Sequence, residues 1–126
     1  MKENEKMKKI LVVDDNQEIL EVIELILRLE GYQVNGLMDA SYFKQRIREF
    51  KPDLILLDVM LGALDGRDLC NLLKSDQLML HIPVIMISAS HNLSDMQGII
   101  CYPNDFIAKP FDIDNLINKV SAQLAA

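Results

Sequence analysis

The stretch PDLILLDVML, residues 52–61, contains a run of four apolar residues, Leu54–Leu57, that ends at Asp58. A continuous run of Leu and Ile, without alternating polar residues, is typical of a strand buried on both faces of a sheet. The same pattern, weaker in the second case, recurs at Ile10–Val13, Gln33–Leu37, Val84–Ile87 and Phe106–Ala108. We therefore predict five short strands.

Segments with helical periodicity separate these runs. In the first of them, from Gln17 to Glu30, apolar residues recur on one face (Ile19, Val22, Ile23, Ile26 and Leu27), and Gly31 is well placed to end the helix. Others extend from Ala40 to Phe50 after the N-cap candidate Asp39, from Arg67 to Lys74 with Leu69, Leu72 and Leu73 inward, and from Ile113 to Leu124 after Asp112. The weakest helix lies within Ser94 to Ile100, where Gly98 interrupts it.

Strands and helices thus alternate five times along the chain. Such alternation predicts a parallel sheet with helices on both faces, and right-handed crossovers restrict the topology to the doubly wound type. Five units suit a flavodoxin-like (βα)5 fold, α/β class, with strand order 2-1-3-4-5, although the pattern alone does not fix that order.

Length and composition narrow the class of protein. The 126 residues fit one domain, for which we predict residues 9–126 after a short charged extension, residues 1–8. The net charge of −6 disfavours direct binding of nucleic acid. No apolar stretch is long enough to cross a membrane, and the charged start lacks the apolar core of a signal peptide, so we expect a cytoplasmic protein. Cys70 and Cys101 have no C-x-x-C spacing, and we expect both to be reduced thiols.

Polar side chains end four of the five predicted strands. Asp14 and Asp15 follow the first strand, Asp58 the third, Ser88 the fourth and Lys109 the fifth. Because the carboxyl ends of parallel strands meet at one edge of a sheet, we expect these side chains to share one neighbourhood. In the predicted order, the crevice at that edge falls between the first and third strands, which carry the three aspartates.

The chemistry of this group points to phosphoryl transfer. Three neighbouring carboxylates repel each other unless a cation offsets their charge, and an all-oxygen site with few ligands suits Mg²⁺. An ammonium and a hydroxyl group beside a carboxylate can stabilise a transferring phosphoryl group, with an Asp oxygen as the nucleophile. Each feature alone is more often a cap, a turn or a strand end, but that interpretation explains the whole set poorly.

As a set, these motifs resemble the receiver domains of two-component response regulators. The likeness extends from about Lys9 to Leu124 and is specific. It rests on ILVVDDN at residues 10–16, PDLILLDVML at residues 52–61, Asp65-Gly66, IPVIMISA at residues 82–89 and DFIAKPF at residues 105–111.

The resemblance implies a phosphorylation switch rather than an enzyme. Asp58 would accept a phosphoryl group from the phosphohistidine of a sensor histidine kinase or of a histidine-phosphotransfer protein. Asp15, Asp58 and the backbone carbonyl of Met60 would hold Mg²⁺, with Asp14 supporting the ion through water. The domain would also catalyse its own phosphorylation and dephosphorylation.

The resemblance also implies how the signal leaves the site. Ser88 and Lys109 would contact the phosphoryl oxygens, and Phe106 would be a switch aromatic that turns inward as Ser88 moves; simple sheet packing is the alternative for Phe106. The Lys109–Pro110 bond is expected to be cis. The face formed by the fourth helix, fifth strand and fifth helix would bind partners, with a second copy of the chain as one of the candidates.

The sequence departs from the family pattern at two places. Gly62 stands where Pro is usual, which would loosen that loop, and Tyr102-Pro103 replaces small residues before the fifth strand.

Two other functions are alternatives to this one. A degenerate receiver, acting as an unphosphorylated interaction module, typically lacks one of the five site residues, which are all present here. A Mg²⁺-dependent phosphohydrolase of the haloacid-dehalogenase type needs an acid where Met60 stands. Both a stand-alone receiver and part of a longer regulator fit the sequence.

Overall fold

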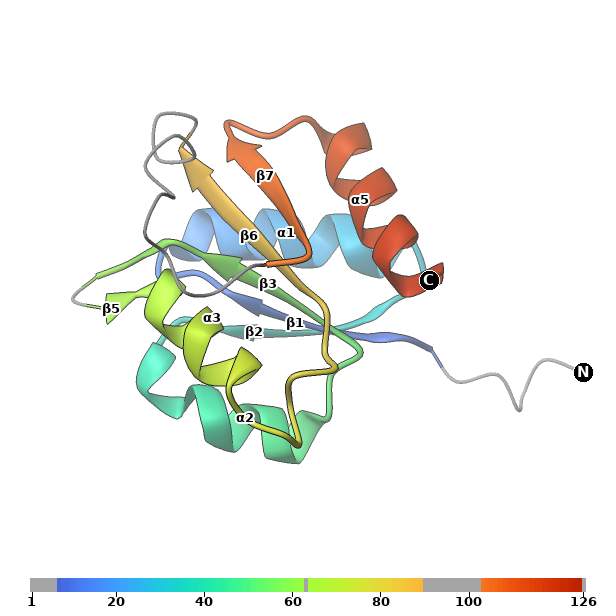
Figure 1. Ribbon diagram of the computed structural model, residues 1–126. Coiled ribbons are helices and arrows are strands. Elements are labelled where there is room, and N and C mark those ends of the chain that lie inside the picture. The colour runs from blue at the N-terminus through green and yellow to red at the C-terminus, as the bar shows by residue number, and fades with distance from the viewer. Residues whose placement is uncertain (1–6, 63, 90–102, 126) are drawn as a thin grey trace, which may run out of the picture.

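The centre of the molecule is a five-stranded parallel sheet in the computed structural model, which describes residues 7–62, 64–89 and 103–125. The strands, in spatial order, are β2 (Gln33–Leu37), β1 (Lys9–Val13), β3 (Leu54–Asp58), β6 (Val84–Ala89) and β7 (Asp105–Lys109) (Figure 1). In chain order these are strands 2, 1, 3, 4 and 5 of the sheet. The predicted doubly wound, flavodoxin-like topology is therefore confirmed.

Helices cover both faces of this sheet. The helices α1 (Gln17–Leu29) and α5 (Ile113–Ala125) pack on one face, and α2 (Phe43–Phe50) and α3 (Gly66–Lys74) pack on the other (Figure 1). The helix predicted within Ser94–Ile100 lies outside the described residues. No helix in the described parts of the chain is long and apolar enough to span a bilayer.

The apolar run of β3 explains why the sheet forms two cores. All four residues from Leu54 to Leu57 are 0% exposed. Successive side chains of a strand point to opposite faces, so Ile55 and Leu57 pack with α2 and α3, whereas Leu54 and Leu56 pack with α1 and α5. A strand buried on both faces needs this continuous pattern, and it fixes Asp58 at the strand's carboxyl end.

Some side-chain predictions are wrong in detail. Val22 is 48% exposed, whereas Leu20 is buried in its place. In α3, Leu72 is exposed and Cys70 is buried instead. Cys70 is also in a disulfide, contrary to the expected free thiol; its bonding partner lies outside the described residues.

The elements near residues 40 and 62 also differ from expectation. Asp39 caps a short 3-10 helix, η1 (Ala40–Tyr42), and α2 begins only at Phe43. A hairpin of β4 (Met60–Leu61) and β5 (Leu64–Asp65) was not predicted at all. Gly62, in its turn, has a φ of +64°, a backbone conformation that glycine adopts at no steric cost. The residue therefore fits a tight hairpin turn.

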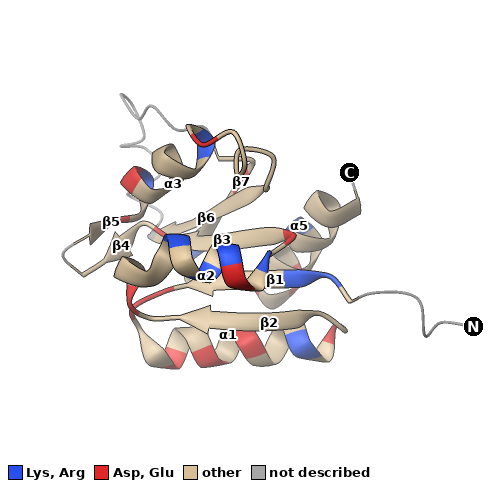
Figure 2. Ribbon diagram, turned by 90° about the horizontal axis from the view of Figure 1, so that it is seen from below, with Lys and Arg blue, Asp and Glu red and all other residues tan. Residues whose placement is uncertain are grey.

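Charge is distributed unevenly over the fold. Figure 2 shows acidic residues along α1, and basic residues on α2 and at the start of β1. The exposed side chains of α1 include Glu18 and Glu21, while those of α2 include Lys44 and Arg48. The net charge therefore does not describe every part of the described surface, since α2 carries exposed basic residues. The absence of nucleic-acid binding stays a prediction.

Candidate functional site

The sheet topology brings the predicted site residues to one edge. Asp14 directly follows β1, Asp58 is the last residue of β3, and Lys109 is the last residue of β7. Ser88 lies within β6, one residue beyond the position that pairs with Asp58, and its side chain is fully buried. Parallel strands thus deliver all these side chains to the carboxyl edge, next to the strand-order reversal between β1 and β3.

Three carboxylates form a cluster at this edge. One oxygen from each of Asp14, Asp15 and Asp58 lies within 4.8 Å of the others. Asp14 and Asp58 are only 1% and 3% exposed, and Asp15 is exposed. Backbone amides orient the two buried groups: Asn16 N donates to Asp14 Oδ1 at 2.9 Å, and Met60 N donates to Asp58 Oδ1 at 3.2 Å. The cluster offers an all-oxygen donor set that could hold a metal ion.

The ammonium of Lys109 connects the far strand to this cluster. Its Nζ lies 2.9 Å from Asp58 Oδ2 and 3.2 Å from Asp14 Oδ2, and 21% of its side chain is exposed. Lys109 thus contacts both buried carboxylates at once, from a strand two places away from β3 in the sheet. The ammonium is therefore positioned to contact a negatively charged group bound at Asp58 as well.

Burial and neighbouring charges shift the pKa values of both Asp58 and Lys109. Burial raises the pKa of Asp58, and the nearby Asp14 carboxylate adds to the rise, against the opposing effect of Lys109. Burial acts to lower the pKa of Lys109, but Asp58 and Asp14 outweigh it, so the pKa is raised. Lys109 therefore stays charged, while burial disfavours the ionised form of Asp58, which a further cation beside the carboxylate would favour.

Two other predicted site residues lie on β4 and β7. Met60 is 63% exposed on β4. Phe106 lies in β7, pairs with Met86 of β6 and packs, partly buried, against the core on the α2 and α3 side. The Lys109–Pro110 peptide bond is cis, as the resemblance implied.

Sequence reasoning missed a backbone contact beneath the phosphoacceptor candidate. Gly66 N donates to Val59 O at 2.7 Å, and a Cβ added to Gly66 would lie 1.9 Å from the backbone oxygen of Asp58. The dipeptide Asp65-Gly66 was noticed only as a motif. Nothing in the sequence indicates that the first turn of α3 touches the end of β3.

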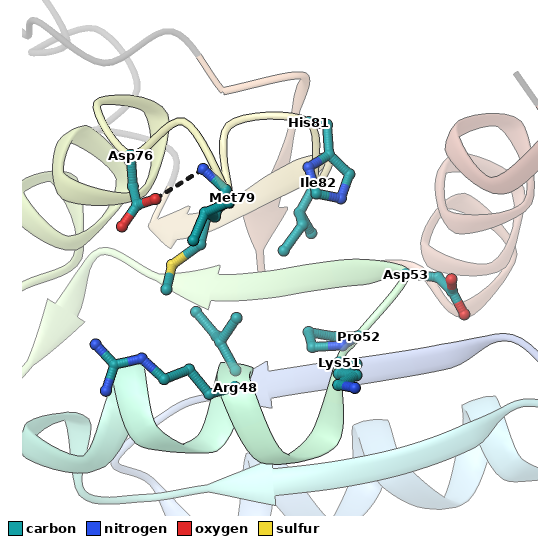
Figure 3. Close-up of a pocket in the computed structure, with 10 residues that line it drawn as sticks. Arg48, Lys51, Pro52, Asp53, Asp76, Met79, His81 and Ile82 are labelled. Carbon is teal, nitrogen blue, oxygen red and sulfur yellow. Dashed lines mark hydrogen bonds between the residues drawn. The ribbon is translucent and has the colours of Figure 1, made fainter.

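A hollow of about 540 Å³ lies at the opposite edge of the sheet, between α2 and residues 76–82 (Figure 3). Its walls include Ile47, Met79 and Ile82, and two carboxylates. Both acids are engaged by backbone amides: Asp53 Oδ2 accepts from Lys9 N and Asp76 Oδ1 from Leu78 N, each at 2.8 Å. These two bonds are structural, whereas the buried carboxylates that contact an ammonium lie at the carboxyl edge.

A flavodoxin-like sheet with an acidic cluster at its strand-order reversal and a lysine on the last strand defines a class of phosphorylation-type signalling domains. Residues 10–121 match the model of the response regulator receiver domain family, and the chain belongs to this family. It is thus the receiver domain of a two-component signalling protein.

Relatives with known sequences and structures agree with this assignment. The chain is 35% identical over 117 residues to the DNA-binding response regulator MtrA of Mycolicibacterium smegmatis, covering 92% of this chain and 50% of MtrA. It is 34% identical over 119 residues to the DNA-binding dual master transcriptional regulator RpaA of Synechocystis sp., covering 94% of this chain and 49% of RpaA. The chain therefore spans about half the length of these relatives.

Two solved structures are similar throughout the fold. The receiver domain of NtrX from Brucella abortus has a TM-score of 0.84 at 34% identity, with 93% of this chain and 98% of that chain covered. The signal receiver domain of a signal transduction histidine kinase from Syntrophus aciditrophicus has a TM-score of 0.85 at 30% identity, with 94% and 90% covered.

Proposed function

We propose that Asp58 accepts a phosphoryl group from the phosphohistidine of a sensor histidine kinase or of a histidine-phosphotransfer protein. The observation that supports this most is the position of Lys109 Nζ, 2.9 Å from Asp58 Oδ2, at the side of a carboxylate cluster. A carboxylate with a cation at one side and further oxygen ligands at the other has what an aspartyl nucleophile for phosphoryl transfer needs.

The transfer forms one bond and breaks one. A carboxylate oxygen of Asp58 bonds to phosphorus while the phosphorus–nitrogen bond of the phosphohistidine breaks, and its electron pair returns to the imidazole, which then takes up a proton. The product on this chain is an acyl phosphate. Lys109 and the Ser88 hydroxyl would hold the phosphoryl oxygens, and the same groups would assist hydrolysis of the acyl phosphate, so the chain acts as a self-resetting switch.

The donor set fits Mg²⁺. Asp15, Asp58 and the backbone carbonyl of Met60 would hold the ion, with Asp14 supporting it, because hard oxygen ligands in small number leave room for water and phosphate oxygens. When bound, Mg²⁺ would offset the charge that the carboxylates and the transferring phosphoryl group share. The raised pKa of Asp58 supports this proposal, since a second cation beside Lys109 favours the ionised nucleophile.

The change caused by phosphorylation would reach a partner through the surface of β7 and α5. Phe106 would change position as Ser88 moves toward the phosphoryl group, and the surface of β7 and α5, with the helix predicted within residues 94–100, would bind a partner or a second copy of this chain. The relatives are DNA-binding regulators about twice as long, which supports a role as the receiver part of such a protein. Residues 9–126 as the domain, residues 1–8 as an extension and a cytoplasmic location belong to the same proposal.

The two rival functions receive less support. A degenerate interaction module does not need an ammonium beside Asp58 to hold a phosphoryl group, and Lys109 is placed there in contact with both buried carboxylates. A phosphohydrolase with an Asp nucleophile needs an acid to protonate the leaving group, and the side chain two residues after Asp58 is the thioether of Met60, which cannot donate a proton.

Intact-mass measurement after incubation with Mg²⁺ and a small acyl-phosphate donor tests the proposal. We expect one added phosphoryl group on the wild type and on an Asp76→Asn control, and none on Asp58→Asn or after chelation of the metal. Asp76 is a suitable control because its carboxylate lies at the opposite edge and accepts a backbone amide, as an Asn side chain can also do. Mass gain on Asp58→Asn equal to that of the wild type would refute the assignment of Asp58.

A further inference from the structure

The backbone at Asp58 and Val59 lies directly against the first residue of α3. Gly66 N donates to Val59 O at 2.7 Å. A Cβ added to Gly66 would lie 1.9 Å from the Asp58 backbone oxygen, 2.9 Å from its carbonyl carbon and 3.1 Å from the Val59 Cα. Close carbon–oxygen contacts are normally about 3.3 Å or longer, so this approach is possible only for a residue without a side chain.

The β4–β5 hairpin also places Met60, whose carbonyl is a proposed metal ligand, beside this turn. β4 and β5 pair antiparallel, and Met60 lies opposite Asp65 in this pairing. Asp65 is itself held firmly: its Oδ1 accepts from Arg67 N at 2.8 Å, and its Oδ2 accepts from Arg67 Nη2 at 2.6 Å. One turn, residues 65–66, therefore contacts the backbone on both sides of Val59.

We propose that the Asp65–Gly66 turn is the template that sets the spacing between the Asp58 carboxylate and the Met60 carbonyl, and that Gly66 is a positioning residue for the metal site. This inference rests on the proposed function, in which both groups hold Mg²⁺. A methyl group on Gly66 must displace either the Asp58 carbonyl or the start of α3 by about 1.4 Å to reach an ordinary contact. A displacement of that size in an oriented site can cost about a hundredfold in rate.

A purely structural role for Gly66 makes different predictions, and two control variants separate them. In Gly36→Ala the new Cβ meets only the carboxylate end of Glu24, with Oε2 at 2.8 Å, and a flexible side chain can move away. In Leu73→Ala a fully buried side chain of α3 is truncated, which destabilises the fold without touching the turn. A general loss of stability would affect Leu73→Ala at least as much as Gly66→Ala.

The test measures Mg²⁺ affinity by titration calorimetry on the folded proteins, with thermal unfolding by circular dichroism alongside. We expect the dissociation constant for Mg²⁺ to rise at least about tenfold in Gly66→Ala and the phosphorylation rate to fall about 10- to 100-fold. Both quantities stay within about twofold of the wild type in Gly36→Ala and Leu73→Ala. Wild-type affinity and rate in a folded Gly66→Ala variant would overturn the proposal.

A second measurement on the wild type decides the matter if Gly66→Ala does not fold. Amide hydrogen exchange is followed with and without Mg²⁺ at Gly66 and at Lys51, whose amide donates to Ile47 O far from the site. The template predicts that Mg²⁺ slows exchange more at Gly66 than at Lys51; equal slowing at both, as from global stabilisation alone, overturns it. If the wild type neither binds Mg²⁺ nor gains a phosphoryl group, the proposed function fails first, and this inference fails with it.

Discussion

Replacing Lys109 with Met tests the electrostatic account of the site, because it removes the cation and keeps most of the side-chain length. In the wild type, Lys109 Nζ contacts the buried carboxylates of Asp14 and Asp58, at 3.2 and 2.9 Å. Removing one partner of a buried ion pair costs about 3–5 kcal/mol. Because 21% of the Lys109 side chain remains exposed, we expect a loss nearer to about 2–3 kcal/mol, or about 10 °C in Tm.

The assay is urea unfolding followed by far-UV circular dichroism, since the chain contains no Trp. Lys119→Met is the matched control: its ion pair with Asp105, at 2.8 Å, is about a third exposed on both sides, and we expect a loss under about 1 kcal/mol. Saturating Mg²⁺ narrows the deficit of Lys109→Met, because the metal binds more tightly where no ammonium repels it. A deficit no larger than that of Lys119→Met, or one that Mg²⁺ leaves unchanged, would refute this reasoning.

Three further substitutions test other parts of the account. The pKa of Asp58 is raised in the fold, mainly by burial, so its contribution to stability is present at low pH and lost as the pH rises through the folded value. Without divalent metal, Asp58→Asn should therefore melt above the wild type at neutral pH, and the difference should vanish near about pH 3. Leu56→Ala, at a fully buried site, should lower the free energy of unfolding by about 2–5 kcal/mol in urea titration, whereas Leu78→Ala, at a position 82% exposed, should change it by less than about 0.5 kcal/mol. Lys74→Met removes bonds from Nζ to Leu80 O, Ile82 O and Asn104 Oδ1, at 3.3, 2.9 and 3.1 Å, and should cost about 1–3 kcal/mol by the same titration.

The sheet could be predicted because its strands are buried on both faces. A run such as Leu54–Leu57 has no other satisfactory location in a chain of this size, and four of the five predicted runs carry a polar site residue at their carboxyl end, at a common edge. Helix faces were harder to predict. In α1, Val22 and Leu20 are both apolar and differ by about half a turn, so composition could not tell which one faces the core.

Contacts made by the backbone were beyond sequence reasoning. The pairing of Met60 with Asp65 involves two-residue strands that have no periodicity to detect. The approach of Gly66 to the Asp58 carbonyl depends on how α3 docks onto the sheet, which is set by tertiary packing of the whole layer. The clustering of the three carboxylates and Lys109 at one edge could therefore be predicted, whereas the contact of the Asp65–Gly66 turn with the end of β3 could not.

Mapping the position of the phosphoryl group tests the central claim most directly. After incubation with Mg²⁺ and an acyl-phosphate donor, borohydride reduction converts an aspartyl phosphate into homoserine, and peptide mass spectrometry then locates the changed residue. The account predicts homoserine at position 58 and at no other aspartate, with none formed when Mg²⁺ is chelated. Homoserine at Asp14 or Asp15, or unmodified Asp58 in a protein that has gained a phosphoryl group, would contradict it.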